Sequence, residues 1–296
     1  MTDDPLSRPL SAPAFASTAD GARFFAAYDA ALARWPVTPE AVDLPSAYGT
    51  TRVNVCGPAD APPLVLLPSG GATSTVWFAN VGELSRTHRV YAVDTIGFTG
   101  RSVHDGRPVR TPADLMDWLD TVFAGLGIAR ADLCGHSYGA WLSLGYALHA
   151  PGRVGRIALL DPTDCFARLG MAYRLRAVPM FIRPTPGWLR WYFAWETGGA
   201  ALDPAWMRMA ELGTRFPSSR IVLPRHPTAG QLRACTAPTL IVLAENSKAH
   251  DIRSVAANAR RMMPHSTITT LPGATHHTLP MAPAGPLNRE LVAFFS

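Results

Sequence analysis

The chain has 296 residues, of which 48% are apolar and 17% are charged, a composition that supports a sizeable core and excludes a largely disordered chain. No apolar run approaches the ~18 residues that a membrane-spanning helix needs. The net charge of +5 comes almost entirely from arginines that are scattered singly, so the basic stripe typical of nucleic-acid-binding proteins is missing and no nucleic-acid partner is expected.

The order of the predicted elements indicates an α/β fold. Residues 1–17 are rich in Pro, Ser and Ala and are expected to be irregular, whereas residues 19–35 carry apolar side chains at helical spacing. Short apolar runs then predict strands at 51–56, 64–67, 90–93, 131–134, 157–160, 240–243 and 267–271. Helices are predicted between them at 74–84, 111–126, 138–149, 251–263 and 286–295. This alternation predicts a mostly parallel, doubly wound sheet that is covered by helices on both faces.

Residues 162–233 interrupt the alternation. The segment is rich in Pro, contains four of the eight tryptophans, and has ten arginines against four acidic residues. We predict a mainly helical lid over the carboxyl edge of the sheet, where open α/β sheets bind ligands, with Trp188 and Trp191 in the wall of the substrate pocket. The predicted division is an N-terminal tail and helix (1–40), a core (41–161 with 234–296) and a lid (162–233).

The segment Leu133-Cys134-Gly135-His136-Ser137-Tyr138-Gly139-Ala140 contains a G-x-S-x-G pattern between a predicted strand and a predicted helix. This is the context of a nucleophile elbow, a sharp turn that lifts a serine hydroxyl clear of the sheet. Glycines are needed at the flanking positions because side chains there would clash with the neighbouring backbone. The N-terminus of the following helix favours the negative charge that develops during acyl transfer. Ser137 is therefore the candidate nucleophile.

A second turn, Ser69-Gly70-Gly71, also follows a predicted strand and precedes a predicted helix. Acyl transfer requires N–H donors that stabilise the oxyanion of the tetrahedral intermediate, and a flexible turn here can aim such a donor at the nucleophile. We predict that the backbone N–H groups of Gly71 and Tyr138 form the oxyanion hole.

From Thr51 to the C-terminus the chain resembles the α/β-hydrolase superfamily, and in particular its lidded serine esterases and lactonases. Ser69-Gly70-Gly71 is similar to the family's His-Gly-x oxyanion loop, with Ser69 in place of His. The loop Asp94-Thr95-Ile96-Gly97-Phe98-Thr99-Gly100-Arg101-Ser102 is similar to the family's D-x-x-G-x-G-x-S loop, with one extra residue, and Asp94 is expected to tether it. The elbow and a late histidine in Gly273-Ala274-Thr275-His276-His277 complete the family order. The resemblance implies the fold and a Ser-His-acid site, but it says little about the substrate.

The resemblance leaves the general base open between two adjacent histidines. The family's spacing after Pro272 selects His276, whereas counting back from Pro280 selects His277. We favour His276, because the length of the last strand fixes where the loop begins. His277 is then expected in the loop or in the wall of the substrate pocket.

A catalytic histidine needs a carboxylate at its second ring nitrogen. The family usually places this acid in the loop after the strand at 240–243, but the matching position here is Ser247. We favour Asp161, at the end of the preceding strand, because some α/β-hydrolases take their acid from that position. Asp164, Glu245 and Asp251 remain alternatives, although Asp251 also suits a helix N-cap.

These residues predict a serine hydrolase that cleaves small or medium carboxylic esters or lactones through an acyl-enzyme intermediate. One alternative is a non-hydrolytic enzyme on the same scaffold, such as a cyclase, lyase or acyl transferase of specialised metabolism, which the missing acid at Ser247 favours. Another is a ligand-binding relative without turnover, which the intact serine, histidine and elbow argue against. Dehalogenase chemistry is disfavoured because it needs Asp where Ser137 stands.

The remaining signals concern location and cofactors. The N-terminus is acidic and lacks an apolar segment behind a basic start, so we expect no secretory signal and a cytoplasmic location. The four cysteines form no C-x-x-C pair and are expected to be buried free thiols. The histidines show no metal-binding spacing, so we expect no metal and no cofactor, only a small-molecule substrate.

Overall fold

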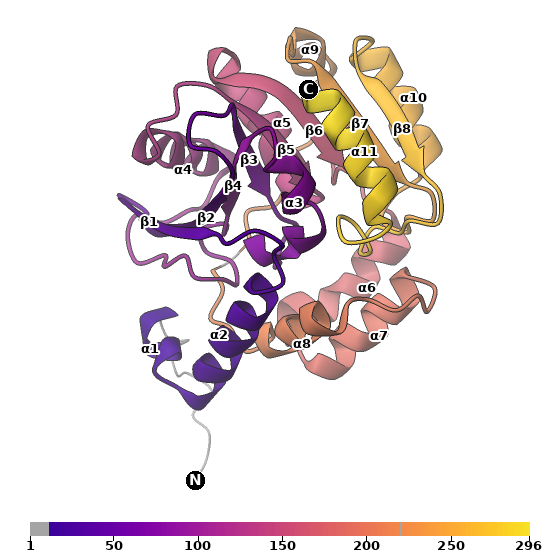
Figure 1. The fold of residues 1–296 in the computed structure, drawn as a ribbon. Coiled ribbons are helices and arrows are strands. Elements are labelled where there is room, and N and C mark those ends of the chain that lie inside the picture. Colours follow the sequence, from indigo (N-terminus) through magenta and orange to yellow (C-terminus); the bar gives the residue numbers. More distant parts are fainter. Residues whose placement is uncertain (1–11, 220) are drawn as a thin grey trace.

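The structure is a computed structural model, and it describes residues 12–219 and 221–296. Its centre is an eight-stranded sheet in the order β1-β2-β4-β3-β5-β6-β7-β8 (Figure 1). β2 pairs antiparallel with both β1 and β4, and all other neighbouring strands are parallel. The strands are β1 (Glu40–Ser46), β2 (Gly49–Cys56), β3 (Pro63–Leu67), β4 (Arg89–Val93), β5 (Ala131–His136), β6 (Val154–Leu160), β7 (Thr239–Ala244) and β8 (Thr267–Leu271).

The central strands are buried on both faces, which explains why they read as continuous apolar runs. All of β7 is buried, as are Leu64–Leu67 in β3. Because side chains alternate along a strand, Val65 and Leu67 join the core on one face, and Leu64 and Leu66 join the core on the other. The predicted mostly parallel sheet with a core on each face is therefore confirmed.

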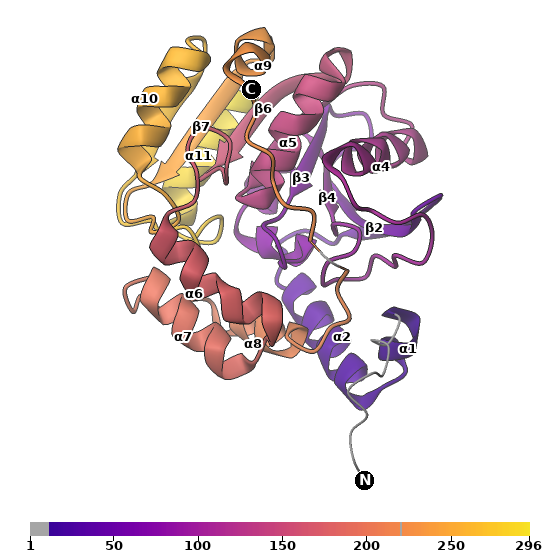
Figure 2. The same ribbon diagram turned by 180° about the vertical axis from the view of Figure 1, so that it is seen from behind.

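Helices cover both faces of this sheet (Figures 1 and 2). α4, α5 and α10 contribute to one core, whereas α3 and α11 contribute to the other. The helices of the core are α3 (Val81–Leu84), α4 (Pro112–Gly125), α5 (Tyr138–His149), α9 (Ala229–Ala234), α10 (Ile252–Met262) and α11 (Ala284–Phe295), with 3₁₀ helices at Ser74–Ala79 and Pro151–Arg153. Within the described residues, no helix combines the length and the apolar character that crossing a bilayer requires.

The predicted helical insertion lies between β6 and β7. It consists of α6 (Met171–Ile182), α7 (Pro186–Glu196) and α8 (Pro204–Gly213), which gather at the end of the sheet where the parallel strands end (Figure 2). α8 packs against the N-terminal helix α2 (Ala19–Leu32). Beyond α8 the chain returns along α5, where the Tyr138 hydroxyl donates to the Val222 carbonyl at 2.8 Å.

Two local expectations were wrong, and one strand was missed. The helix predicted at 74–84 is interrupted at Asn80, whose backbone φ of −120° departs from helical geometry, and its side-chain amide donates to the Pro280 carbonyl. β1 was not predicted, because it is an edge strand with mostly exposed side chains and therefore lacks a buried apolar run. Residues 12–16 of the stretch expected to be irregular form α1 (Ala12–Ala16), and the rest of that expectation, residues 1–11, lies outside the described residues.

Candidate active site

Ser137 occupies a strained turn between β5 and α5. Its backbone has φ 56° and ψ −112°, a conformation that non-glycine residues rarely adopt. A Cβ on Gly135 would lie 2.1 Å from the Gly139 carbonyl oxygen, and a Cβ on Gly139 would lie 2.1 Å from the Leu67 carbonyl oxygen. The glycine requirement of the predicted elbow therefore has a direct steric cause.

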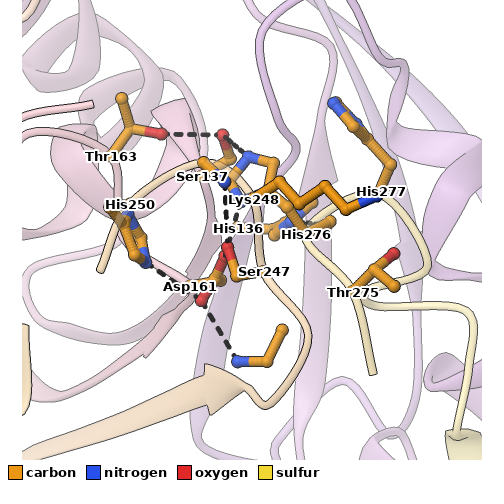
Figure 3. A network of polar contacts seen from close by, with 12 residues as sticks. His136, Ser137, Asp161, Thr163, Ser247, Lys248, His250, Thr275, His276 and His277 are labelled. Atoms are coloured by element: carbon orange, nitrogen blue, oxygen red, sulfur yellow. Dashed lines mark hydrogen bonds and ion pairs between the residues drawn. The ribbon is translucent and has the colours of Figure 1, made fainter. Parts of the chain in front are cut away.

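Ser137, His276 and Asp161 form a continuous chain of hydrogen bonds (Figure 3). The Ser137 Oγ lies 2.8 Å from the His276 Nε2, and the His276 Nδ1 lies 2.6 Å from the Asp161 Oδ2. The three side chains follow β5, β8 and β6, so the shared carboxyl edge of these parallel strands brings them together although they are far apart in sequence. In this arrangement His276 donates from Nδ1 to the carboxylate and accepts the serine proton at Nε2.

The Asp161 carboxylate is fully buried and accepts hydrogen bonds from several further groups. Its Oδ1 accepts from the Ala244 N–H at 3.1 Å and lies 3.2 Å from the His250 Nε2. Its Oδ2 accepts from the Ser247 hydroxyl at 2.7 Å. Burial by itself would raise the pKa of Asp161, but the charges of His250 and His276 and their hydrogen bonds hold that pKa well below its ordinary range. The carboxylate is thus kept ionised where it meets His276.

The other carboxylates considered from the sequence have different partners. Asp164 accepts from the Leu169 N–H at 3.2 Å, and Glu245 accepts from the Gly273 N–H at 2.9 Å. Asp251 caps α10 through the N–H groups of its first turn. Ser247, at the family's usual acid position, instead donates to Asp161.

The two adjacent histidines have separate surroundings. The His277 Nε2 lies 3.1 Å from the Tyr173 hydroxyl and 3.3 Å from the Tyr192 hydroxyl, both from the lid. Burial, with the neighbouring His276 and His136, lowers the pKa of His277 well below its ordinary value, so its ring stays neutral. His277 therefore lies in the contact between the lid and the His276 loop.

Thr163 is a polar partner of the serine that was not predicted from the sequence. Its Oγ1 lies 2.9 Å from the Ser137 Oγ. Because Ser137 directs its single hydroxyl proton to His276, the Thr163 hydroxyl is the donor in this contact. The only sequence signal was the position of Thr163, two residues after Asp161 in the same turn.

Glu196, at the end of α7, was also missed. Its side chain is fully buried, and Oε1 accepts the backbone N–H of His276 at 3.1 Å and that of Lys248 at 3.4 Å. Oε2 accepts the N–H of His277 at 3.1 Å. One carboxylate from the lid thus joins the two loops that follow β7 and β8, and no local sequence pattern indicated this contact.

The predicted oxyanion donors come from the first residue of α5 and from the loop after β3. Tyr138 is the first residue of α5, where helix geometry provides no acceptor for its N–H. Gly71 has φ 78°, and its carbonyl accepts from the Thr99 hydroxyl at 2.5 Å, which anchors the loop. A Cβ on the preceding Gly70 would lie 3.6 Å from the Tyr138 Cβ, so this loop runs alongside the elbow.

The predicted pocket tryptophans are placed elsewhere than expected. Trp188 and Trp191 are each nearly half exposed on the outer side of α7. Their ring centroids lie 5.4 Å apart in an edge-to-face contact. The lid aromatic ring beside the base is that of Tyr173, whose centroid lies 5.7 Å from that of His276. The wall of the site next to His276 is therefore formed by Tyr173.

Comparison with known proteins agrees with this fold. Residues 64–289, more than half of the chain, match the model of the Alpha/beta hydrolase family. Carboxylesterase YbfK of Bacillus subtilis is 29% identical over 88% of this chain and 90% of its own length. The uncharacterised carboxylesterase nap of the same organism is 28% identical over 94% of this chain and 93% of its own length.

Solved structures of carboxylesterases share this fold as well. The crystal structure of naproxen esterase (carboxylesterase NP) from Bacillus subtilis has a TM-score of 0.88 at 28% identity and covers 94% of this chain and 99% of its own. That of carboxylesterase CesB (YbfK) from the same organism has a TM-score of 0.88 at 27% identity, with the same coverage. The chain therefore belongs to the α/β-hydrolase family and is an enzyme similar to its carboxylesterases.

Proposed function

We propose that the chain is a serine hydrolase that cleaves small or medium carboxylic esters or lactones through an acyl-enzyme intermediate. The observation that carries this proposal is the chain of hydrogen bonds from Ser137 through His276 to Asp161, with distances of 2.8 and 2.6 Å. The strained backbone of Ser137 supports it, because such strain persists where function requires it.

In the proposed acylation step, the Ser137 Oγ attacks the carbonyl carbon of the ester while His276 Nε2 removes the hydroxyl proton. The carbonyl π electrons move to the oxygen, which the N–H groups of Gly71 and Tyr138 stabilise. Asp161 stabilises the imidazolium through Nδ1. Collapse of the tetrahedral intermediate expels the alkoxide, which takes the proton from His276 Nε2 and leaves as an alcohol.

Deacylation repeats these steps with water as the nucleophile. His276 removes a proton from the water, the tetrahedral intermediate forms in the same oxyanion hole, and Ser137 leaves as the protonated alcohol. With a lactone the alcohol remains part of the acyl group, so the product is one hydroxy acid. The donor contact of Thr163 to the Ser137 Oγ keeps the serine side chain oriented between turnovers.

Asp161 also bears on the non-hydrolytic alternative. That alternative was favoured by the absence of an acid at Ser247. Since Asp161 already bonds to His276 and Ser247 donates to the same carboxylate, Ser247 is no argument against an ordinary hydrolytic triad. A triad acid from β6 supports hydrolysis as the better proposal.

The test is hydrolysis of p-nitrophenyl acetate, p-nitrophenyl butyrate and a small lactone by the purified chain. Ser137→Ala should lower kcat by at least about 1000-fold while circular dichroism and thermal unfolding stay unchanged. Ser254→Ala is the matched control, because this serine lies on α10 and its hydroxyl contacts Asp251. Turnover of all three substrates by Ser137→Ala at the rate of the parent chain would refute the proposal.

A further inference from the structure

The large apolar side chains that are exposed in the described part of the chain all belong to the lid. Such side chains are expected singly on any protein surface, but their confinement to one segment indicates a contact surface. They are Met171, Leu175, Val178, Ile182, Trp188, Trp191 and Leu223, with exposures from 43% to 78%.

Six of these side chains lie on the adjacent helices α6 and α7. Met171, Leu175, Val178 and Ile182 are spaced by four, three and four residues, so they lie on one side of α6. Trp188 and Trp191 follow on α7, and the Arg176 guanidinium of α6 lies 6.0 Å from the Trp191 ring, which joins the two helices. We call this surface the α6–α7 face.

The charge around the α6–α7 face has one sign. Residues 171–195 contain four arginines and no acidic residue. Arg190 pairs with Glu211 of α8 at 2.8 Å, whereas Arg174, Arg176 and Arg183 form no ion pair with any described residue. The next acidic residue, Glu196, is buried and accepts backbone N–H groups, so it does not offset the exposed arginines.

We propose that the α6–α7 face docks onto the surface of a bilayer that contains anionic phospholipids. Such a surface offers phosphates to the arginines and an acyl boundary to the apolar stripe, and tryptophan side chains favour this interface. A symmetric contact with a second copy of the chain would place the same acid-free, arginine-bearing surface against itself, where like charges repel. Because no described helix is suited to crossing a bilayer, the contact is peripheral.

The position of this face links docking to the surroundings of Ser137. Ser137 itself is buried, with 8% of its surface exposed. The inner side of the same helices holds the His276 loop, through Tyr173 of α6 and Glu196 of α7. A bilayer on the outer side of α6 and α7 would therefore contact the same helices that hold the His276 loop on their inner side. The docking itself does not depend on the proposed hydrolysis.

The experiment is flotation of the full chain with vesicles of phosphatidylcholine, alone or mixed with an equal part of phosphatidylglycerol. We expect flotation with the mixed vesicles, weakening with added salt, and a blue shift of tryptophan emission. Arg174→Gln and Arg183→Gln should each weaken binding about fivefold, whereas Arg260→Gln on α10 should not. The double substitution Leu175→Gln and Ile182→Gln should abolish binding, and Leu223→Gln, in the lid but outside the face, should retain it.

Any of three results would overturn the proposal. The first is equal flotation of the parent chain and the Leu175→Gln/Ile182→Gln variant, and the second is no flotation with the mixed vesicles. The third is a stable dimer that does not float and that the same double substitution converts to a monomer, which would assign the face to a second copy. Hydrolysis of a water-soluble ester, measured in parallel, reports on the proposed function independently, because none of these side chains touches the triad.

Discussion

Replacement of Asp161 by asparagine tests the assignment of the triad acid. The Oδ1 of Asp161 accepts the backbone N–H of Ala244, a donor that cannot change, so the asparagine oxygen must take that side. The amide nitrogen then faces the His276 Nδ1 at the position where Oδ2 now lies at 2.6 Å. The ring is driven to the tautomer that carries its proton on Nε2, which cannot accept the serine proton.

The expected loss in kcat for Asp161→Asn is about 10⁴-fold, or about 5.5 kcal/mol of transition-state stabilisation. Adding Ser247→Asp to Asp161→Asn should partly restore activity. In the parent chain the Ser247 Oγ lies 2.7 Å from the Asp161 Oδ2, so a carboxylate at position 247 would start close to the place of the lost one. A charged hydrogen bond of about 1.5 to 3 kcal/mol corresponds to a recovery of roughly 10- to 150-fold. Ser247→Asp alone should instead lower activity and stability, because two carboxylates would share one buried site.

The assay is kcat and kcat/KM for p-nitrophenyl butyrate, with circular dichroism to show that each variant is folded. Glu245→Gln is the matched control, since Glu245 bonds to Gly273 and should be dispensable for the chemistry. Full activity of Asp161→Asn would refute the acid assignment. A folded Asp161→Asn/Ser247→Asp chain that is no faster than Asp161→Asn would refute the geometry inferred for position 247.

Three further predictions concern buried groups around the site. Glu196→Gln turns an amide N–H toward backbone N–H donors and should lower the free energy of unfolding by about 2 to 3 kcal/mol in urea titrations; a change below about 0.5 kcal/mol would contradict this. His250→Gln removes a group that lowers the pKa of Asp161, so the stability lost as pH falls below the unfolded aspartate value of about 3.9 should shrink in thermal unfolding scans, and an unchanged loss would count against the contact. Burial lowers the pKa of His136 to about 3, so stability is complete above the unfolded value of about 6.5 and falls as pH drops toward 3. His136→Gln keeps an amide donor for the His276 carbonyl and should flatten this fall in thermal unfolding scans; identical pH slopes would argue against a neutral buried ring.

Much of the fold could be predicted because its signals are local. The central strands β3, β5, β6 and β7 are buried on both faces and read as apolar runs, and the elbow glycines are required by close backbone contacts within a short segment. β1 escaped prediction because an edge strand that is largely exposed needs no apolar run.

The candidate site was only partly predictable, because its supporting contacts join distant segments. Glu196 and His276 are separated by 80 residues, and His250 and Asp161 by 89, so no spacing rule links them. The ambiguity between Asp161 and the other carboxylates had the same origin, since the sequence gives no distance to His276. Trp188 and Trp191 were expected to face the pocket on composition alone, whereas helix periodicity directs them outward.

The central claim is that Ser137 is a nucleophile activated by His276. Its most direct test is the rate of labelling by a fluorophosphonate probe, with the modified residue identified by mass spectrometry. The account predicts a single adduct on Ser137, loss of labelling in His276→Gln, and retention of labelling in His277→Gln. An adduct on another residue, or labelling of His276→Gln at the rate of the parent chain, would contradict it.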